Sequence, residues 1–320
     1  APQSHPHRHP PGMELILTGL FCSLAATLAS PVSPAVDGAI IRTDLRPDGV
    51  PVVLLPPGLL DEELKTSYPF QKFPGEFVKE ALNSSVDWRT KGAVTPAKDQ
   101  GAHGYCGTFG RVAAAEGQYA LRSNRGLRNF SEEELVDCIG WDKDQFGYFR
   151  VNGFIDSADY PYDTTGPDMD PPIPDHPCLY GQKEVIKGTA FGNFTNSTGR
   201  APDEQQLAAF IYKNGPVQTG INANVFGMRA KGCEATGDCF ITEEMCNDPS
   251  IKGKGIDHSI TLVGYGTHAV HGDYWIVKNS WSTKFANQGF IYVARGISCA
   301  QIDCCGNVYT YGDPASYYKV

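Results

Sequence analysis

The sequence predicts an α+β fold in which helices come first and antiparallel strands follow. Residues 109–122 are rich in alanine, and apolar or small side chains recur there at steps of three or four, which is the spacing of one helical face. Residues 131–138 begin with Ser and carry Glu three positions later, the pattern of a helix capping box. Three later runs rich in Ile, Val, Tyr and Phe predict antiparallel strands at residues 257–266, 274–278 and 289–295.

The composition of the chain fits a folded protein that does not bind nucleic acid. Its 320 residues allow one large domain or two smaller ones, and 41% of them are hydrophobic, which is enough for a sizeable core. The formal net charge is −9 and the sequence contains no basic stripe, which argues against a nucleic-acid partner. We expect a monomer that needs no cofactor and no metal.

An apolar run near the N-terminus predicts a secretory signal peptide. Residues 1–12 precede the first methionine, Met13, and are rich in proline and histidine. Residues 15–29 are apolar but shorter than the roughly 20 residues that a membrane-spanning helix needs, and they end in the small-x-small form of a cleavage site. Residues 33–35 offer an alternative site. The run predicts entry into the secretory pathway, toward a lysosome-like compartment or the extracellular space, without a membrane anchor.

Cys106 is the candidate nucleophile. It follows a glycine-rich stretch and precedes the alanine-rich helix, so unpaired N–H groups and the positive end of the helix dipole favour its thiolate. The alternative is a buried structural cysteine. Two later segments favour catalysis: His258 lies in an apolar strand-like run, and Asn279 ends a second such run, two residues before Trp281.

Short motifs along residues 86–320 carry a family resemblance. In chain order they are Val86-Asp87-Trp88-Arg89, Gly92-Ala93-Val94-Thr95-Pro96, Gln100 to Cys106, Ser131 to Cys138, Tyr160-Pro161-Tyr162, Gly215-Pro216-Val217, Asp257-His258, Val263-Gly264-Tyr265-Gly266 and Lys278-Asn279-Ser280-Trp281. With these motifs in this order, the chain resembles the papain-like cysteine proteases.

The resemblance implies a fold and an activity. The family has a two-lobed α+β fold with a helical N-terminal lobe and an antiparallel, β-barrel-like C-terminal lobe, and the active site lies in the cleft between them. We therefore expect a cysteine-type endopeptidase that acts on peptides or proteins. Cys106 would act as the thiolate nucleophile and His258 as the imidazolium paired with it. Asn279 would orient His258, and Gln100 would complete the oxyanion hole with the Cys106 backbone N–H.

Substrate binding is where the chain departs from the family. The tryptophan that usually follows the nucleophile is Gly107 here, and the family's Cys-Asn-Gly-Gly loop is absent. Ile256 is expected to line the substrate pocket, Trp281 to cover the His258–Asn279 hydrogen bond, and His103 to be exposed to solvent. The competing interpretation is a secreted papain-like scaffold with a structural or binding role and little turnover. A transglutaminase-like transferase shares the chemistry but not the order of the motifs.

The resemblance also divides the chain. Residues 1–29 would be an upstream extension and signal peptide, residues 30–82 a short atypical propeptide or a spacer, and residues 83–320 the peptidase domain. The proline-rich second segment lacks the family's long inhibitory helix. Residues 226–255 are longer than the corresponding family loop and would lie beside the cleft.

Cysteine count and sequons fit a secreted chain. Of ten cysteines, one lies in the signal segment and one is the candidate nucleophile, and the remaining even number fits a disulfide framework. A zinc site is the less favoured alternative because no C-x-x-C pair is present. The resemblance implies a bridge between Cys138 and Cys178, and one from Cys305 to Cys239 or Cys246. Sequons predict possible glycosylation at Asn83, Asn129, Asn193 and Asn196.

Overall fold

The structure of the chain is a computed structural model. It describes residues 40–42, 44–46, 49, 52–54, 73–139, 145–164, 178, 185–186, 190–193, 203–303 and 307–310. The predicted signal segment, Asn196 and Cys305 lie outside this part. Within it, no helix combines the length and the apolar character that crossing a membrane requires.

The first half of the described chain is helical. Helix α2 spans Cys106–Arg122, α3 spans Glu133–Cys138 and α4 spans Gln145–Asn152. Both predicted helices are confirmed, although α2 begins three residues earlier than expected and α3 two residues later. A small core holds them together, and it consists of Val112, Ala115, Tyr119, Phe130, Leu135, Phe149 and Phe154.

The predicted capping box before α3 is only half formed. The Ser131 hydroxyl accepts the Glu134 backbone N–H at 3.0 Å, as the motif requires. The Glu134 carboxylate does not return to Ser131 but accepts the Ile155 backbone N–H at 2.7 Å. The glutamate therefore ties the helix to strand β4 (Phe154–Ile155), which pairs with β5 (Val185–Ile186).

The second half is built on one sheet. Among the described residues its strands lie in the order β6-β12-β7-β9-β10-β11-β8, and β3 pairs with β9. Every pair is antiparallel except β11 with β8. The predicted strands are confirmed as β9, β10 and β11. The bounds are β3 (Val86–Asp87), β6 (Ala190–Asn193), β7 (Val217–Ile221), β8 (Phe240–Ile241), β9 (His258–His268), β10 (Gly272–Lys278), β11 (Phe290–Ala294) and β12 (Asn307–Thr310).

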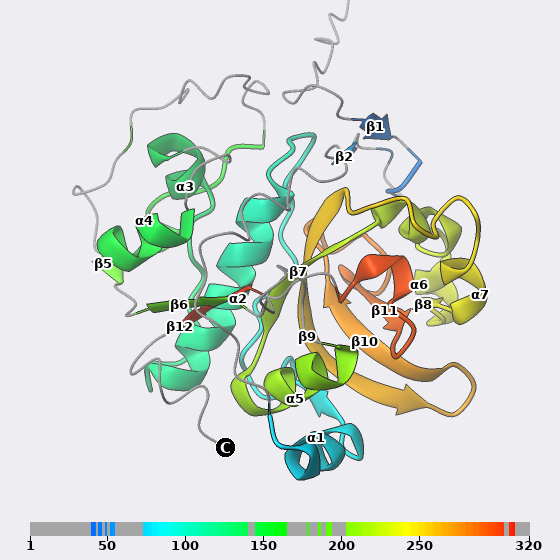
Figure 1. Ribbon diagram of the computed structural model, residues 1–320. Coiled ribbons are helices and arrows are strands. Elements are labelled where there is room, and N and C mark those ends of the chain that lie inside the picture. Colours follow the sequence, from blue (N-terminus) through cyan, green and yellow to red (C-terminus); the bar gives the residue numbers. More distant parts are fainter. Residues whose placement is uncertain are drawn as a thin grey trace, which may run out of the picture. The chain divides into compact units, whose positions relative to one another are not determined.

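Shorter elements surround the sheet. Helix α1 lies beside α5 at one end of it, as Figure 1 shows, and both contribute to the larger core of the molecule. The bounds of these elements are β1 (Ile40–Arg42), β2 (Val52–Leu54), α1 (Gly75–Leu82), α5 (Glu204–Asn214), η2 (Ala223–Met228), α6 (Cys233–Thr236), α7 (Glu243–Cys246) and η3 (Cys299–Gln301).

Helix α2 meets the sheet along β7 and β9 (Figure 1). The contact is close because position 110 of the helix is glycine. A Cβ atom at Gly110 would lie 2.7 Å from the Ser259 hydroxyl oxygen, inside van der Waals contact. The Thr261 hydroxyl donates to the Gly110 carbonyl at 3.0 Å. The N-terminus of α2 is thereby held against the start of β9.

Close packing also requires a glycine at position 264, where β9 pairs with β3. An ideal Cβ atom at Gly264 would lie 2.1 Å from the Val86 carbonyl oxygen. We expect Gly264→Ala to lower the free energy of unfolding by about 2–3 kcal/mol, because the backbone has to move. Denaturant unfolding measures this, with Gly75→Ala as the control, since no atom lies within 4 Å of a Cβ there. Equal stability of the two variants would contradict the prediction.

Three disulfides appear among the described residues. Cys138 pairs with Cys178, as the resemblance implies, while Cys233 pairs with Cys239 and Cys246 with Cys299. The expectation that Cys305 bonds Cys239 or Cys246 is therefore wrong, because both sulfurs are already used by nearer cysteines. Four of the cysteines of the zinc alternative, Cys233, Cys239, Cys246 and Cys299, are bonded in these disulfides, while Cys304 and Cys305 lie outside the described residues.

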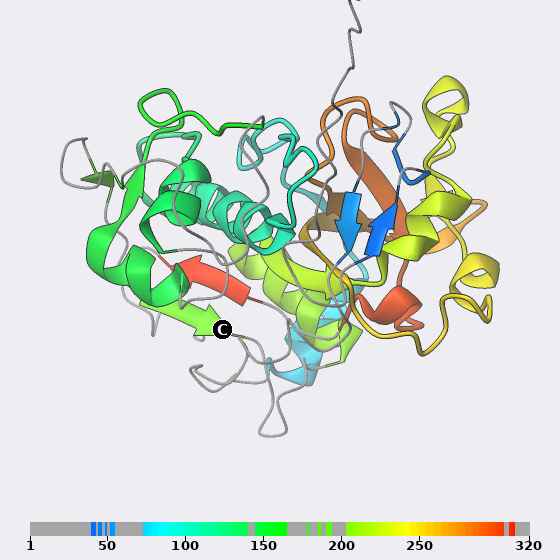
Figure 2. The same ribbon diagram turned by 90° about the horizontal axis from the view of Figure 1, so that it is seen from above.

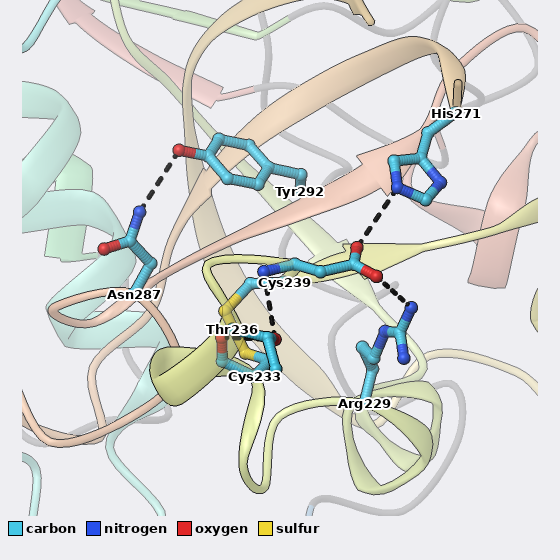
Figure 3. The surroundings of a disulfide bond; sticks show 8 residues. Arg229, Cys233, Thr236, Cys239, His271, Asn287 and Tyr292 are labelled. Atoms are coloured by element: carbon cyan, nitrogen blue, oxygen red, sulfur yellow. Dashed lines mark hydrogen bonds and ion pairs between the residues drawn. A yellow bond between two sulfur atoms is a disulfide. The ribbon is translucent and has the colours of Figure 1, made fainter. Parts of the chain in front are cut away.

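The long segment 226–255 is tied to the β9–β10 hairpin near one of these bridges. Figure 3 shows Arg229 and His271 directed at the carboxylate beside Cys239. That carboxylate belongs to Asp238, with its oxygens 2.6 Å from Arg229 Nη2 and 3.1 Å from His271 Nε2. The histidine comes from the turn between β9 and β10. The insertion thus has a fixed place on the sheet, set by the Cys233–Cys239 bridge and this ion pair.

Candidate active site

Cys106 is the first residue of α2 and is fully buried. It is free of any disulfide. Its sulfur interacts with the backbone N–H groups of Gly107 and Ser259. Because Ser259 directly follows His258 on β9, this contact brings the candidate nucleophile to the strand that carries the candidate base.

His258 and Asn279 form a hydrogen-bonded pair. His258 is the first residue of β9, and Asn279 directly follows β10, which is the antiparallel neighbour of β9. The two strands therefore bring the side chains together across 21 positions of sequence, with His258 Nε2 at 2.8 Å from Asn279 Oδ1. Because that oxygen only accepts, Nε2 carries the proton. The other ring nitrogen, Nδ1, has no hydrogen-bond partner among the described residues.

Aromatic rings enclose this pair. The Trp281 ring lies 4.7 Å from the His258 ring at an interplanar angle of 35°, and it is fully buried. Phe226, on the 3-10 helix η2, meets both rings edge-on. The enclosure keeps water away from the His258–Asn279 hydrogen bond, which strengthens it.

Gln100 is held by both halves of the chain, through hydrogen bonds to His103 and to Ser280, the neighbour of Asn279. Its side-chain carbonyl accepts the Ser280 hydroxyl at 2.6 Å, and its backbone N–H donates to the Ser280 carbonyl at 2.9 Å. The side-chain Nε2 donates to the His103 carbonyl at 2.7 Å. One N–H of that amide is thus engaged, and the other is the donor that an oxyanion hole would use.

The surroundings of the pair affect the ionisation that the resemblance implies, a thiolate and an imidazolium. Burial raises the pKa of Cys106 to about 12. Burial also lowers the pKa of His258 to about 4, only partly offset by the Asn279 hydrogen bond. Burial therefore favours the neutral forms of the thiol and the imidazole. The physical reason is that both side chains are fully removed from water, which disfavours their charged forms.

Leu45 and Arg46, from the N-terminal part of the chain, contact residues that adjoin the site. Arg46 is fully buried and forms an ion pair with Asp99, the neighbour of Gln100. Leu45 is fully buried against η2, where a Cβ atom at Gly227 would lie 3.0 Å from its Cδ2. Figure 2 shows the β1–β2 hairpin between the teal loop that precedes α2 and the η2 segment.

His103 and Ile256, two residues expected near the cleft, are both buried. His103 is 5% exposed, so its predicted exposure to solvent is wrong; the ring stacks on Tyr105 at 5.6 Å and is covered by Tyr162. Ile256 is buried as well and precedes Asp257, whose carboxylate accepts the Ala223 backbone N–H at 2.7 Å. The expectation that Ile256 lines the substrate pocket stays a prediction.

Arg111 lies next to Gly107, the position at which the family usually has tryptophan. A Cβ atom at Gly107 would lie 3.3 Å from Arg111 Nη1, and that nitrogen donates to Gln145 Oε1 at 2.7 Å. Arg111 is 2% exposed. The residue after the nucleophile is therefore small because the guanidinium one turn later on α2 occupies the adjoining volume.

A buried charge cluster behind the site escaped the sequence analysis. Lys98 Nζ lies 2.7 Å from a carboxylate oxygen of both Glu116 and Glu132. Lys278, next to Asn279, lies 3.8 Å from Glu116 and donates to the Thr95 hydroxyl at 2.7 Å. The available signal was Glu116 itself, since it is a charged residue on the buried face of an alanine-rich helix.

The candidate glycosylation sites are only partly described. Asn83 and Asn129 are exposed. Asn193 is the last residue of β6, and Asn196 lies outside the described residues. The sequons therefore stay predictions.

Comparison with known proteins places the chain. The papain family cysteine protease model matches residues 82–309. Cathepsin L1 of Drosophila melanogaster is 35% identical over 225 residues, which is 67% of this chain and 54% of that protein. Procathepsin L of Felis catus is 33% identical over 228 residues, 67% of this chain and 61% of that protein. The chain thus spans between about half and three fifths of the length of these relatives.

A solved structure confirms the fold class. The digestive procathepsin L2 proteinase from the Tenebrio molitor larval midgut superposes with a TM-score of 0.58 and 26% identity, covering 78% of this chain and 75% of that one. The two-lobed α+β fold expected from the sequence is therefore present. The chain belongs to the papain family of cysteine proteases.

Proposed function

We propose that the protein is a cysteine-type endopeptidase whose catalytic residues are Cys106, His258, Asn279 and Gln100. The observation that carries this proposal is the arrangement around His258: one ring nitrogen is hydrogen-bonded to Asn279, while the other has no partner among the described residues and Cys106 lies at the adjoining backbone. Peptides or proteins are the proposed substrates.

Proton transfer within the pair starts the reaction. With substrate bound, His258 Nδ1 takes the proton from the Cys106 thiol, and the thiolate attacks the peptide carbonyl carbon. The imidazolium is stabilised by Asn279, which keeps accepting from Nε2. His258 then donates the proton to the leaving amine, and a thioester remains on Cys106. Water, deprotonated by His258, hydrolyses the thioester and restores the thiol.

Two donors are proposed to stabilise the oxyanion that forms in each attack. The first is the backbone N–H of Cys106, which has no carbonyl four residues earlier within its helix, because Cys106 begins α2. The second is the N–H of Gln100 that does not bond to the His103 carbonyl. Gln100 is fully buried and fixed at both ends of its amide, so the donor needs little reorganisation.

The segment 30–82 is proposed to be a short propeptide, with residues 83–320 as the peptidase domain. Support comes from the burial of the catalytic pair and from two residues of this segment: Arg46 pairs with Asp99, and Leu45 is buried against Gly227. The three disulfides support a passage through the oxidising secretory pathway, ending in a lysosome-like compartment or outside the cell.

Replacing the nucleophile tests the proposal. We expect Cys106→Ala to reduce kcat for quenched fluorogenic peptides by at least about 10⁴-fold, because the covalent route is lost. The assay uses mildly reducing buffer near pH 5.5 and protein from which the N-terminal segment has been released. Correctly folded wild-type protein with no turnover, and with no labelling of Cys106 by a thiol-directed probe, would favour the scaffold interpretation instead.

A further inference from the structure

Two neighbouring residues of the N-terminal segment, Leu45 and Arg46, are buried against residues that adjoin the candidate active site. Arg46 is held by two hydrogen bonds to Asp99, from Nη1 to Oδ1 at 2.6 Å and from Nη2 to Oδ2 at 2.8 Å. The guanidinium is fully buried, while the carboxylate keeps 36% of its surface exposed. This two-point geometry fits the planar fork of arginine and not the point charge of lysine.

Asp99 is fixed independently of Arg46. Its Oδ1 accepts the Gly101 backbone N–H at 2.9 Å. Its backbone forms a bridge with Trp281, the ring that covers the His258–Asn279 pair. The carboxylate is therefore held at the site by the backbone on either side of Gln100, and it stays in place when Arg46 leaves.

The position next to the arginine is apolar. Leu45 is fully buried in the larger core, and its side chain sits over Gly227, where any Cβ atom would crowd it. Phe226, the neighbour of that glycine, touches the His258 ring. The aliphatic position is thus connected to the His258 ring through η2, and the basic position is the next residue of the segment.

Arg42, which precedes Leu45 and Arg46 in the chain, marks a second and weaker position for a basic side chain. Arg42 donates to Asn224 Oδ1, and Asn224 Nδ2 donates to Asp257 Oδ2 at 2.8 Å. Arg42 remains 31% exposed and also pairs with Asp44 within its own segment. The charge here is shared and solvated, so this contact discriminates less than Asp99 does.

We propose that Asp99 is a specificity-determining residue that binds an arginine side chain of the substrate, next to an aliphatic residue held over Gly227. The inference rests on the proposed peptidase function and names its substrate class: peptides that carry arginine beside an aliphatic residue. The formal net charge of −9 favours such basic peptides at long range. When the segment is released, Asp99 loses a two-point partner that a substrate arginine can replace.

The test uses the chain with Arg46→Ala, cut between Leu54 and Phe73 so that the N-terminal segment is released and none of its arginines competes at Asp99. Quenched peptides of one sequence carry arginine, or its neutral isostere citrulline, at each position on both sides of the cleaved bond. We expect arginine to raise kcat/KM by about 10- to 100-fold at one position, the range of a charge-assisted hydrogen-bonded pair. This increase in kcat/KM should come from a lower KM, with kcat little changed.

Asp99→Asn in the same background should bring the arginine-to-citrulline ratio close to one. Asp248→Asn, which removes the same charge from an exposed turn, should leave the ratio as it was. An unchanged ratio in Asp99→Asn, or no position that prefers arginine, would overturn the inference.

Binding separates this inference from the proposed function. In the Cys106→Ala background, the affinity of fluorescent arginine and citrulline peptides is measured by anisotropy, without turnover. An arginine preference that Asp99→Asn abolishes supports the binding position even if the wild-type chain hydrolyses nothing, in which case only the peptidase proposal fails. Equal affinities for the two peptides overturn the inference, whatever the activity is.

Discussion

Cutting the chain between Leu54 and Phe73, at a specific protease site inserted there, is expected to speed alkylation of Cys106 at pH 7 by at least about tenfold. Burial raises the pKa of this thiol to about 12 in the intact chain, whereas an unperturbed cysteine titrates near 8.5. Alkylating reagents react with the thiolate, so the buried thiol reacts slowly. We expect release of the segment that carries Leu45 and Arg46 to expose the site to water and thereby to remove the cause of the shift.

The pH dependence gives this prediction a second readout. Far below its pKa, the thiolate fraction grows tenfold with each pH unit, so the alkylation rate of the uncut chain should rise steadily from pH 7 to 9. In the cut chain the rise should flatten as pH passes the lowered pKa. Mass spectrometry of the labelled peptide identifies the cysteine. Identical rates and pH profiles before and after cutting would mean that the segment does not cover the nucleophile.

Glu116→Ala is expected to destabilise the protein by about 3–5 kcal/mol. Glu116 is fully buried, and its carboxylate accepts from Lys98 at 2.7 Å, from the Phe130 backbone N–H at 2.9 Å and from Thr95. Its removal leaves Lys98 and Lys278 in a dry environment with Glu132 as the remaining counter-charge. An unbalanced buried charge costs far more than a lost surface pair.

The measurement is thermal unfolding. For a protein of this size each kcal/mol corresponds to roughly 2–4 °C in Tm, so a decrease of about 6–20 °C is expected. Glu80→Ala, at an exposed position of α1, controls for the loss of a glutamate and should change stability by less than about 0.5 kcal/mol. Equal Tm values for the two variants would show that the cluster does not contribute to stability.

Local sequence patterns were sufficient to predict α2, α3, β9, β10 and β11. The three- and four-residue spacing in residues 109–122 corresponds to α2, and the apolar runs correspond to β9, β10 and β11. Periodicity reports which face of an element is buried, and that holds whatever the partner is. The short elements of residues 226–255 carried no such pattern, because each is only a few residues long and depends on its disulfides.

The residues of the candidate site could be named from motifs, but their protonation states could not be predicted from them. Cys106, His258 and Asn279 stand next to recognisable residues in the sequence. Whether the thiol is ionised depends on how much water reaches it, and that is decided by segments distant in sequence. The burial of His103 and the pairing of Cys246 with Cys299 escaped prediction for the same reason.

The sequence by itself indicated the family, two of the helices, three of the strands and the candidate catalytic residues, because these follow from residue type and local spacing. Only the tertiary structure decided that burial shifts the pKa values of Cys106 and His258 toward their neutral forms and that Arg46 is paired with Asp99. Only it placed Arg111 in the volume beside Gly107. Desolvation, ion pairing and volume exclusion act between residues that are close in space and far apart in the chain, so local spacing does not encode them.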